Sequence, residues 1–245
     1  MTETTARKLL CVTAHPDDEC FAFGGALMLA AEAGVETSVI CFTDGQAATN
    51  RGDATSGEHL GEMRRAEFFA SCKILDVTHA EILDYQDAQL EFADFSATVA
   101  KLVERIRREK FDVVLTFGGD GAMNTHADHT MVSAFTTAAF HWAASPKRFR
   151  DLGPTHAAQR LFYNTTHFFF PGRPAPLPAP WTVTLDVSRV QARKFDAFRA
   201  HTSQVPLMDK FQGYFEQHIG QEVYTLVATP IPQPATQMTD LFEGM

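Results

Sequence analysis

The sequence predicts one α/β domain with a Rossmann-like, mostly parallel central sheet flanked by helices. Short apolar runs of strand length alternate with longer segments of helical period, which is the pattern of βαβ units. The chain of 245 residues is also long enough for one large core but short for two full domains. We therefore expect a single domain over residues 1–245, in which the proline-containing stretch from about 230 to 245 is an extended or loosely docked tail.

The elements are expected in alternating β-α order through about residue 145. Short apolar, β-branched runs indicate strands, and apolar residues at helical spacing indicate helices. Gly34 offers a C-cap for the first helix, and the stretch Pro171–Pro180 can be neither regular helix nor central strand. The predicted strands are Leu9–Val12, Thr37–Phe42, Ala80–Leu83, Val113–Phe117, Leu161–Thr165 and Val183–Val187. The predicted helices are Gly25–Ala33, His59–Leu75, Phe95–Glu109, His129–Ala143, Ser188–His201 and Leu207–His218.

Composition excludes several classes of function. The net charge of −9 argues against binding to nucleic acid or to an anionic membrane, because both need clustered Lys and Arg. Four scattered cysteines form no C-x-x-C pair, which favours a reducing compartment over a disulfide framework. The apolar run before His15 is too short for a signal-peptide core, and no stretch approaches membrane-spanning length. We expect a cytoplasmic protein without nucleic-acid or membrane partners, and leave open whether it forms a homo-oligomer.

Polar loops follow three of the predicted strands. The segment Thr13–Glu19 reads Thr-Ala-His-Pro-Asp-Asp-Glu and comes directly after the first strand. Two longer polar loops, Asp44–Gly57 and Gly118–His129, follow the second and fourth strands. Because the carboxyl ends of parallel strands meet at one edge of a sheet, where open α/β sheets bind ligands, we expect these loops to converge.

Two of these loops hold candidate residues for a catalytic metal site. His15 and Asp18 can face one ion, and the cluster His126-Ala127-Asp128-His129 supplies further imidazoles and a carboxylate. Two histidines and one carboxylate form a three-ligand set, which for zinc leaves a fourth position for water. Zinc lowers the pKa of bound water from about 15.7 toward about 7, so such a site predicts hydrolysis at neutral pH.

The remaining groups of the two loops suit proton transfer. Asp17, next to Asp18, is the natural general base, and a protonated His126 could hydrogen-bond an oxyanion and later donate to a leaving amine. Asp128 would orient an imidazole and fix its tautomer. The reaction class that uses all of these groups is hydrolysis of an amide.

Other interpretations compete with this one. Asp17, Asp18 and Glu19 could be carboxylates in the first turn of a helix, favoured by its dipole, which explains their charge but not His15. A nucleotide-binding oxidoreductase is disfavoured because the first strand-to-helix turn lacks G-x-G-x-x-G and carries carboxylates where phosphates would bind. A catalytically silent sugar- or nucleotide-binding protein with the same fold remains an alternative.

The sequence resembles the PIG-L/LmbE-like zinc-dependent N-deacetylases over nearly the whole chain to about residue 204. The segment from His15 to Glu19 is similar to the family motif A-H-P-D-D-E, and His126–His129 is similar to H-P-D-H, with Ala127 where the family often has proline. Further similar segments are Gly61–Glu67 to R-x-x-E, Leu83–Asp87 to L-x-Y-x-D, and Lys194–Gln204 to K…H-x-S-Q. The resemblance implies the LmbE-like variant of the Rossmann-like fold.

The resemblance also implies a role for each matching residue. It makes His15, Asp18 and His129 the ligands of one zinc ion per chain, although His and Asp ligands also suit iron or cobalt. It makes Asp17 the general base and His126 the imidazole that stabilises the oxyanion. It assigns three residues to the substrate: Arg64, His201 and Gln204. Arg64 could instead be a solvated helix charge paired with Glu67, and His201 and Gln204 could cap a helix.

The implied substrate is a small N-acetylated sugar, an N-acetylglucosaminyl conjugate that loses acetate. A thiol-conjugate amidase with the same metal site is the nearest alternative. The run Phe168–Phe170 with Trp181, around the proline-rich loop, could wall a substrate pocket or belong to the core.

Overall fold

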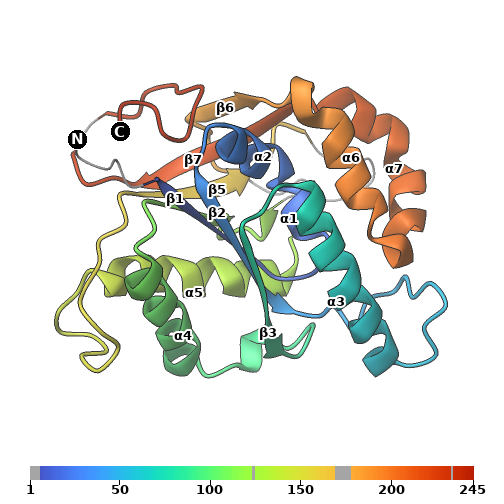
Figure 1. Cartoon of the computed structure of the whole chain (residues 1–245), viewed down its shortest axis with the longest axis horizontal. Helices are drawn as coiled ribbons and strands as arrows, with labels where there is room; N and C mark the ends of the chain where they lie inside the picture. Colours follow the sequence, from blue (N-terminus) through green and yellow to red (C-terminus); the bar gives the residue numbers. More distant parts are fainter. Residues whose placement is uncertain (1–5, 123–124, 169–177, 233) are drawn as a thin grey trace.

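The computed structural model describes residues 6–122, 125–168, 178–232 and 234–245, which form one sheet between two layers of helices (Figure 1). Its seven strands have the order β3-β2-β1-β4-β5-β7-β6. The strands are β1 (Lys8–Thr13), β2 (Glu36–Thr43), β3 (His79–Tyr85), β4 (Val113–Phe117), β5 (Arg160–Thr165), β6 (Val183–Asp186) and β7 (Gln221–Ala228). The helices are α1 (Asp18–Phe21), α2 (Gly24–Glu32), α3 (Gly57–Ile74), α4 (Phe95–Glu109), α5 (Ala127–Ala143), α6 (Gln191–Arg199) and α7 (Val205–His218).

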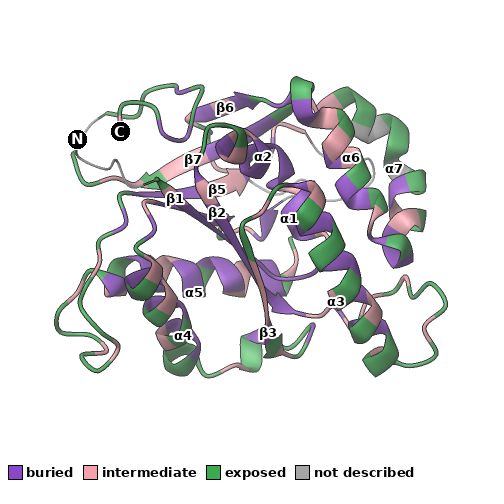
Figure 2. Cartoon of the chain, viewed as in Figure 1, coloured by how far each residue is buried: buried purple, intermediate pink, exposed green. Residues whose placement is uncertain are grey.

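The predicted fold class is confirmed. Strands β1 to β5 pair in parallel, and helices α4 and α5 cover one face of the sheet while α2, α3 and α6 cover the other (Figure 1). The central strands are therefore buried on both sides (Figure 2), and the side chains of β1 from Leu9 to Val12 have no exposed surface. A strand covered on both faces needs apolar side chains at every position, which is why it reads as a continuous apolar run.

The sequence-based prediction omits β7, which pairs antiparallel with both β5 and β6. Glu222, Val223 and Tyr224 are consecutive and all buried, so the segment lacks the period-two alternation that marks a half-exposed strand. Only pairing with strands far away in sequence makes it a strand. The sheet is consequently mixed at this edge.

Two helix boundaries differ from the prediction for local reasons. Helix α5 begins at Ala127, earlier than expected, because the Nδ1 of His126 accepts a hydrogen bond from the Asp128 amide at 3.1 Å and caps the helix. Helix α6 is shorter than expected, since 3-10 turns flank it at Ser188–Val190 and Thr202–Gln204.

The C-terminal stretch packs against the sheet at its end. Met238 forms a parallel bridge with Val183, and the Arg160 guanidinium donates to the carbonyls of Leu241 at 2.7 Å and Glu243 at 2.6 Å. The stretch after residue 230 thus leads to a docked end beside β5 and β6. None of the described helices is long and apolar enough to cross a bilayer.

Arg107 ties α4 to the end of α5, and its loss is expected to destabilise the fold. Its buried guanidinium donates to five carbonyls, those of Trp142, Ala143, Ser145, Arg148 and Phe149. We expect Arg107→Met to lower the free energy of unfolding by about 3 kcal/mol, because these acceptors lose a charged donor. Urea unfolding measures this, with the exposed neighbour changed in Arg108→Met as control. Equal effects of the two substitutions would contradict the assignment.

Candidate metal and hydrolytic site

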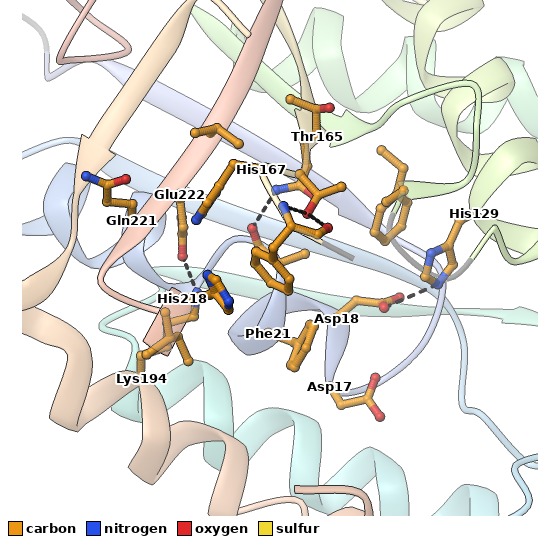
Figure 3. A pocket seen from close by; sticks show the side chains of 18 of the residues that line it. Asp17, Asp18, Phe21, His129, Thr165, His167, Lys194, His218, Gln221 and Glu222 are labelled. Atoms are coloured by element: carbon orange, nitrogen blue, oxygen red, sulfur yellow. Dashed lines mark hydrogen bonds and ion pairs between the residues drawn. The ribbon is translucent and has the colours of Figure 1, made fainter. Parts of the chain in front are cut away.

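The predicted residues of the first and second motifs meet where β1 and β4 end. These two strands are parallel neighbours, so the loop before Asp18 and the loop before α5 leave the sheet at the same edge. Asp18 begins α1, and His129 lies in the first turn of α5. Figure 3 shows Asp17, Asp18 and His129 together at one end of a cavity.

The three expected ligand residues lie at the spacing of a metal coordination shell. His129 Nε2 is 3.3 Å from His15 Nδ1 and 3.3 Å from Asp18 Oδ1, and His15 Nδ1 is 3.6 Å from Asp18 Oδ2. Zinc bonds to N and O ligands are about 2.0 to 2.2 Å long, so the edges of a tetrahedron around zinc measure about 3.3 to 3.6 Å. The donor set and its spacing therefore fit a small divalent ion.

Hydrogen bonds hold both imidazoles with one nitrogen turned toward this position. Nε2 of His15 lies 3.0 Å from Asp87 Oδ1 and 3.2 Å from Asp128 Oδ2, and Nδ1 of His129 lies 3.1 Å from the Gly121 carbonyl. Because these partners are acceptors, each imidazole donates its proton outward, and the nitrogen facing its neighbour keeps a lone pair for a metal. The Asp18 carboxylate is held too, by the amides of Ala14 and His15.

The electrostatics of this position favour positive charge. Burial opposes protonation of His15, but hydrogen bonds to Asp128 and Asp87 outweigh it and raise the pKa of His15 to about 10. Burial likewise opposes the charge of Asp18, yet the neighbouring His129 and His15 bring the pKa of this carboxyl well below its usual range. A metal cation would satisfy the same carboxylates that otherwise attract a proton.

Asp87 contacts His15 as closely as Asp128 does, although it is not among the site residues that the sequence predicts. One of its oxygens bonds His15, and the other accepts from the Ala47 amide at 3.0 Å. The available signal was its place at the end of the segment Leu83–Asp87, where the family resemblance continues. Asp128 has a similar double role, because it also accepts from the amides of the segment Ala88–Leu90.

Asp17 lies beside the ligands with its carboxylate held in place. The Arg64 guanidinium donates to Asp17 Oδ2 at 2.9 Å, to the Gly45 carbonyl at 3.0 Å and to the Pro16 carbonyl. Asp17 has φ 112°, a conformation that L-residues rarely adopt, and its amide donates to Glu19 Oε2 at 2.9 Å. Burial raises the pKa of Asp17 to about 6 even though Arg64 opposes the rise. A carboxylate with such a pKa can accept protons near neutral pH.

His126 lies next to His15, and the centroids of the two rings are 4.7 Å apart. Its Nδ1 accepts the capping bond from Asp128, so the proton is on Nε2, which can donate to a ligand. Burial and the neighbouring His15 and His129 lower the pKa of His126. Ligand atoms of these three histidines lie within 4.8 Å of one another, so His126 is close enough to this position to act on a group bound there.

The three residues expected at the substrate are all buried, and two of them, Arg64 and His201, contact Asp17 or its neighbour Glu19. Arg64 bonds the Asp17 loop, so it is not the solvated helix charge considered as an alternative. His201 Nε2 is 2.7 Å from Glu19 Oε1, and Gln204 donates to the Asn50 carbonyl at 3.0 Å. None of the three lines the cavity described below. Their role in substrate binding stays a prediction. The contacts of Arg64 and His201 favour an indirect role, in which they hold the loop that carries Asp17 in place.

The buried His201–Glu19 pair is expected to make stability depend on pH. Burial lowers the pKa of His201, but the charge and hydrogen bond of Glu19 outweigh this and raise it above its usual range. The stabilisation is complete below about pH 6.5, the pKa of an unfolded histidine, and is lost as pH rises through the raised native pKa. Urea unfolding should give a stability difference between wild type and His201→Gln that shrinks from pH 6 to pH 9.

The control for this prediction is His79→Gln, since the His79 side chain is 64% exposed beside Glu36. Its effect on the free energy of unfolding is expected to be small at every pH. A difference for His201→Gln that grows with pH would contradict the pairing.

A cavity of about 180 Å³ opens from the metal position toward β5, β7 and α7. Phe168, one of the residues expected to wall a pocket, lines it, whereas Trp181 is 40% exposed and lies elsewhere. Phe169 and Phe170 fall outside the described residues. The described lining residues are Asp17, Asp18, Phe21, Ala22, Phe117, Ala122, His129, Asn164, Thr165, Thr166, His167, Phe168, Lys194, Phe198, Leu207, His218, Ile219, Gln221, Glu222 and Val223.

A candidate metal position, a neighbouring carboxylate and an adjoining cavity, all at the ligand-binding edge of an α/β sheet, are typical of a hydrolase with a metal centre. Comparison with known families narrows this class. The chain belongs to the PIG-L family, described as GlcNAc-PI de-N-acetylase, whose model matches residues 10–140. The family resemblance seen in the sequence is thereby confirmed.

Individual relatives agree with this placement. A 1D-myo-inositol 2-acetamido-2-deoxy-alpha-D-glucopyranoside deacetylase of Actinosynnema mirum is 31% identical, over 84% of this chain and 83% of that protein. The structure of an N,N'-diacetylchitobiose deacetylase from Pyrococcus horikoshii has a TM-score of 0.73 at 22% identity, covering 93% of this chain and 88% of the other. The 4-carboxy-2-hydroxymuconate hydratase GalB of Pseudomonas putida shares the fold at a TM-score of 0.66 and 19% identity, covering 93% and 99%. Fold likeness alone therefore does not choose the reaction.

Proposed function

We propose that this protein is a zinc-dependent N-deacetylase that removes the acetyl group of an N-acetylglucosaminyl conjugate. The observation that carries the proposal is the 3.3 to 3.6 Å spacing of donor atoms from His15, Asp18 and His129, with the Asp17 carboxylate beside them. Membership of the PIG-L family supports the deacetylase reaction, and the relatives support an N-acetylated sugar as substrate.

His15 Nδ1, Asp18 and His129 Nε2 would hold one ion per chain, with a fourth position left for water or substrate. When bound, the ion supplies Lewis acidity, which polarises the amide carbonyl and lowers the pKa of water toward about 7. Nitrogen and carboxylate ligands suit zinc but do not exclude iron or cobalt. Asp87 and Asp128 keep His15 in the tautomer that such a site requires.

Asp17 acts as the general base in this mechanism. It accepts a proton from the attacking water as the new C–O bond forms to the acetyl carbon. His126 Nε2–H donates a hydrogen bond to the oxygen that gains negative charge. When the C–N bond breaks, the proton that Asp17 took from water passes to the leaving amine, so that acetate and a free amine are the products. The lowered pKa of His126 favours its neutral ring, so its expected second role as proton donor to the amine is not part of this mechanism. Arg64 holds the Asp17 carboxylate through a hydrogen bond of 2.9 Å.

The nearest alternative is an amidase that cleaves a larger thiol conjugate with the same residues. The second alternative is a catalytically silent binding protein. The likeness to GalB concerns the fold and gives no support to a hydratase reaction in a site with this donor set.

Two measurements test the proposal. Release of acetate and free amine is measured for a panel of N-acetylglucosaminides and for thiol-conjugated amides, and elemental analysis of the purified protein measures its metal content. The proposal expects about one zinc per chain and turnover of the N-acetylglucosaminides. Turnover confined to the thiol conjugates would favour the amidase, and absence of both stoichiometric metal and turnover would favour the silent protein.

A further inference from the structure

The cavity beside the metal position changes character along its length. Near His129 it is lined by carboxylates, whereas toward α7 apolar side chains line it together with a smaller number of polar ones. Figure 3 shows His218, Gln221 and Lys194 on the side of the cavity opposite His129. The apolar lining there comes from α1, α6, α7, β7 and the turn between α7 and β7, and consists of Phe21, Phe198, Leu207, Ile219 and Val223.

Aromatic rings form one wall of this apolar end. The rings of Phe168 and His218 stack with centroids 4.6 Å apart and an angle of 16° between their planes. Thr166 holds Phe168 in place, because its hydroxyl accepts from the Phe168 amide at 3.1 Å and donates to the Phe168 carbonyl at 2.6 Å. His167 also lies in this wall, and burial together with His218 lowers its pKa, which favours the uncharged ring.

The two charges at this end neutralise each other. Lys194 Nζ is 2.5 Å from Glu222 Oε1, and both side chains are buried. Glu222 also accepts from the amides of Gly25 at 2.7 Å and Ala26 at 2.9 Å and from the Tyr224 hydroxyl at 2.7 Å. Among the described lining residues Lys194 is the one Lys or Arg, and its charge is already paired. An anionic substituent would meet no uncommitted Lys or Arg among these residues.

We propose that this end of the cavity binds an apolar alkyl or aryl group of the amide substrate. The inference rests on the proposed function, and it names the kind of substrate that the same site prefers. A polyhydroxylated ring would turn part of its hydroxyl groups toward the phenylalanine and aliphatic side chains, and each hydroxyl buried there without a partner costs free energy. An apolar group gains from the same contacts. A cavity of about 150 Å³ lined by apolar side chains accommodates benzene, and the whole cavity here, its metal end included, measures about 180 Å³.

The apolar group could belong to the acyl chain or to the aglycone, and binding experiments distinguish the two. Calorimetry with the zinc-loaded protein compares two product series, carboxylates from acetate to hexanoate and glucosaminides from methyl to hexyl. One series should bind about fourfold more tightly per added methylene, with an increasingly negative heat-capacity change. Binding that does not depend on chain length in either series would overturn the inference, whether or not the protein is a deacetylase.

Kinetics of variants test whether the side chains of this end of the cavity contact the apolar group of the substrate. For each variant, kcat/KM is measured for a substrate with a longer apolar group and for its methyl or acetyl counterpart. We expect the ratio of the first value to the second to fall about tenfold in Phe168→Ala and in Ile219→Asn. The matched control is Phe92→Ala, because Phe92 is 74% exposed and lies outside the cavity. An unchanged ratio in both cavity variants, or higher kcat/KM for N,N'-diacetylchitobiose than for alkyl glycosides, would overturn the inference. Chain-length-dependent binding without any amide turnover would instead overturn the proposed function.

Discussion

Asp17→Asn is expected to lower kcat for deacetylation about 10³-fold while leaving the metal content unchanged. Asparagine has nearly the shape of aspartate and can still accept a hydrogen bond from Arg64, but it cannot take a proton from water. Asp17 is not one of the three residues whose donor atoms surround the candidate metal position. The prediction is measured by acetate release at saturating substrate, with zinc content and melting temperature determined on the same preparation.

The matched control for this substitution is Asp84→Asn. The Asp84 side chain is 93% exposed and pairs with Arg65 on the surface, so its replacement should leave kcat within about twofold of wild type. If Asp17→Asn retained full activity with normal zinc content, Asp17 would not be the base. If it instead lost zinc, its carboxylate would belong to the coordination shell.

His129→Ala is expected to reduce zinc affinity by more than about 100-fold and to abolish turnover. Loss of a residue that only orients a ligand already costs about 10- to 100-fold in metal affinity, so loss of a ligand should cost more. His129 Nε2 faces both His15 and Asp18, and no other described imidazole takes its place against Asp18 at that distance. Competition with a chromogenic chelator measures the affinity, and acetate release measures turnover.

His141→Ala is the control on the same helix, because His141 is exposed in the last turn of α5. Its zinc affinity should equal that of wild type. His129 also stacks on Phe117 with ring centroids 4.0 Å apart, so the variant requires a circular-dichroism check that it is folded. A folded His129→Ala protein that kept stoichiometric zinc at wild-type affinity would contradict the assigned ligand set.

Much of the candidate site could be predicted because its residues are local in sequence. His15 and Asp18 are three residues apart in one loop, and His126 and His129 are three residues apart at one helix start. Each pair follows an apolar strand, and parallel strands place such loops at one edge. The chemistry of imidazole and carboxylate side chains then indicated a metal and a base.

The hydrogen-bond partners that hold these residues in place could not be predicted in the same way. Glu19 joins the Asp17 amide to His201, a residue 182 positions later in the chain, and Asp87 reaches His15 from the end of β3. In the sequence His201 looked like a substrate-binding or capping residue. Its burial depends on how α6 packs against α1 and α3, which no local pattern reports.

By itself the sequence determined the parallel part of the sheet, the edge at which ligands bind and the donor types available there. Periodicity and residue chemistry suffice for these, because they are local properties of the chain. Only the tertiary structure decided that Arg64 holds Asp17, that Asp87 holds His15 and that the cavity ends in apolar walls from α7 and the unpredicted β7. Those outcomes depend on which distant segments pack together, because a side chain's direction and burial follow from its neighbours in space.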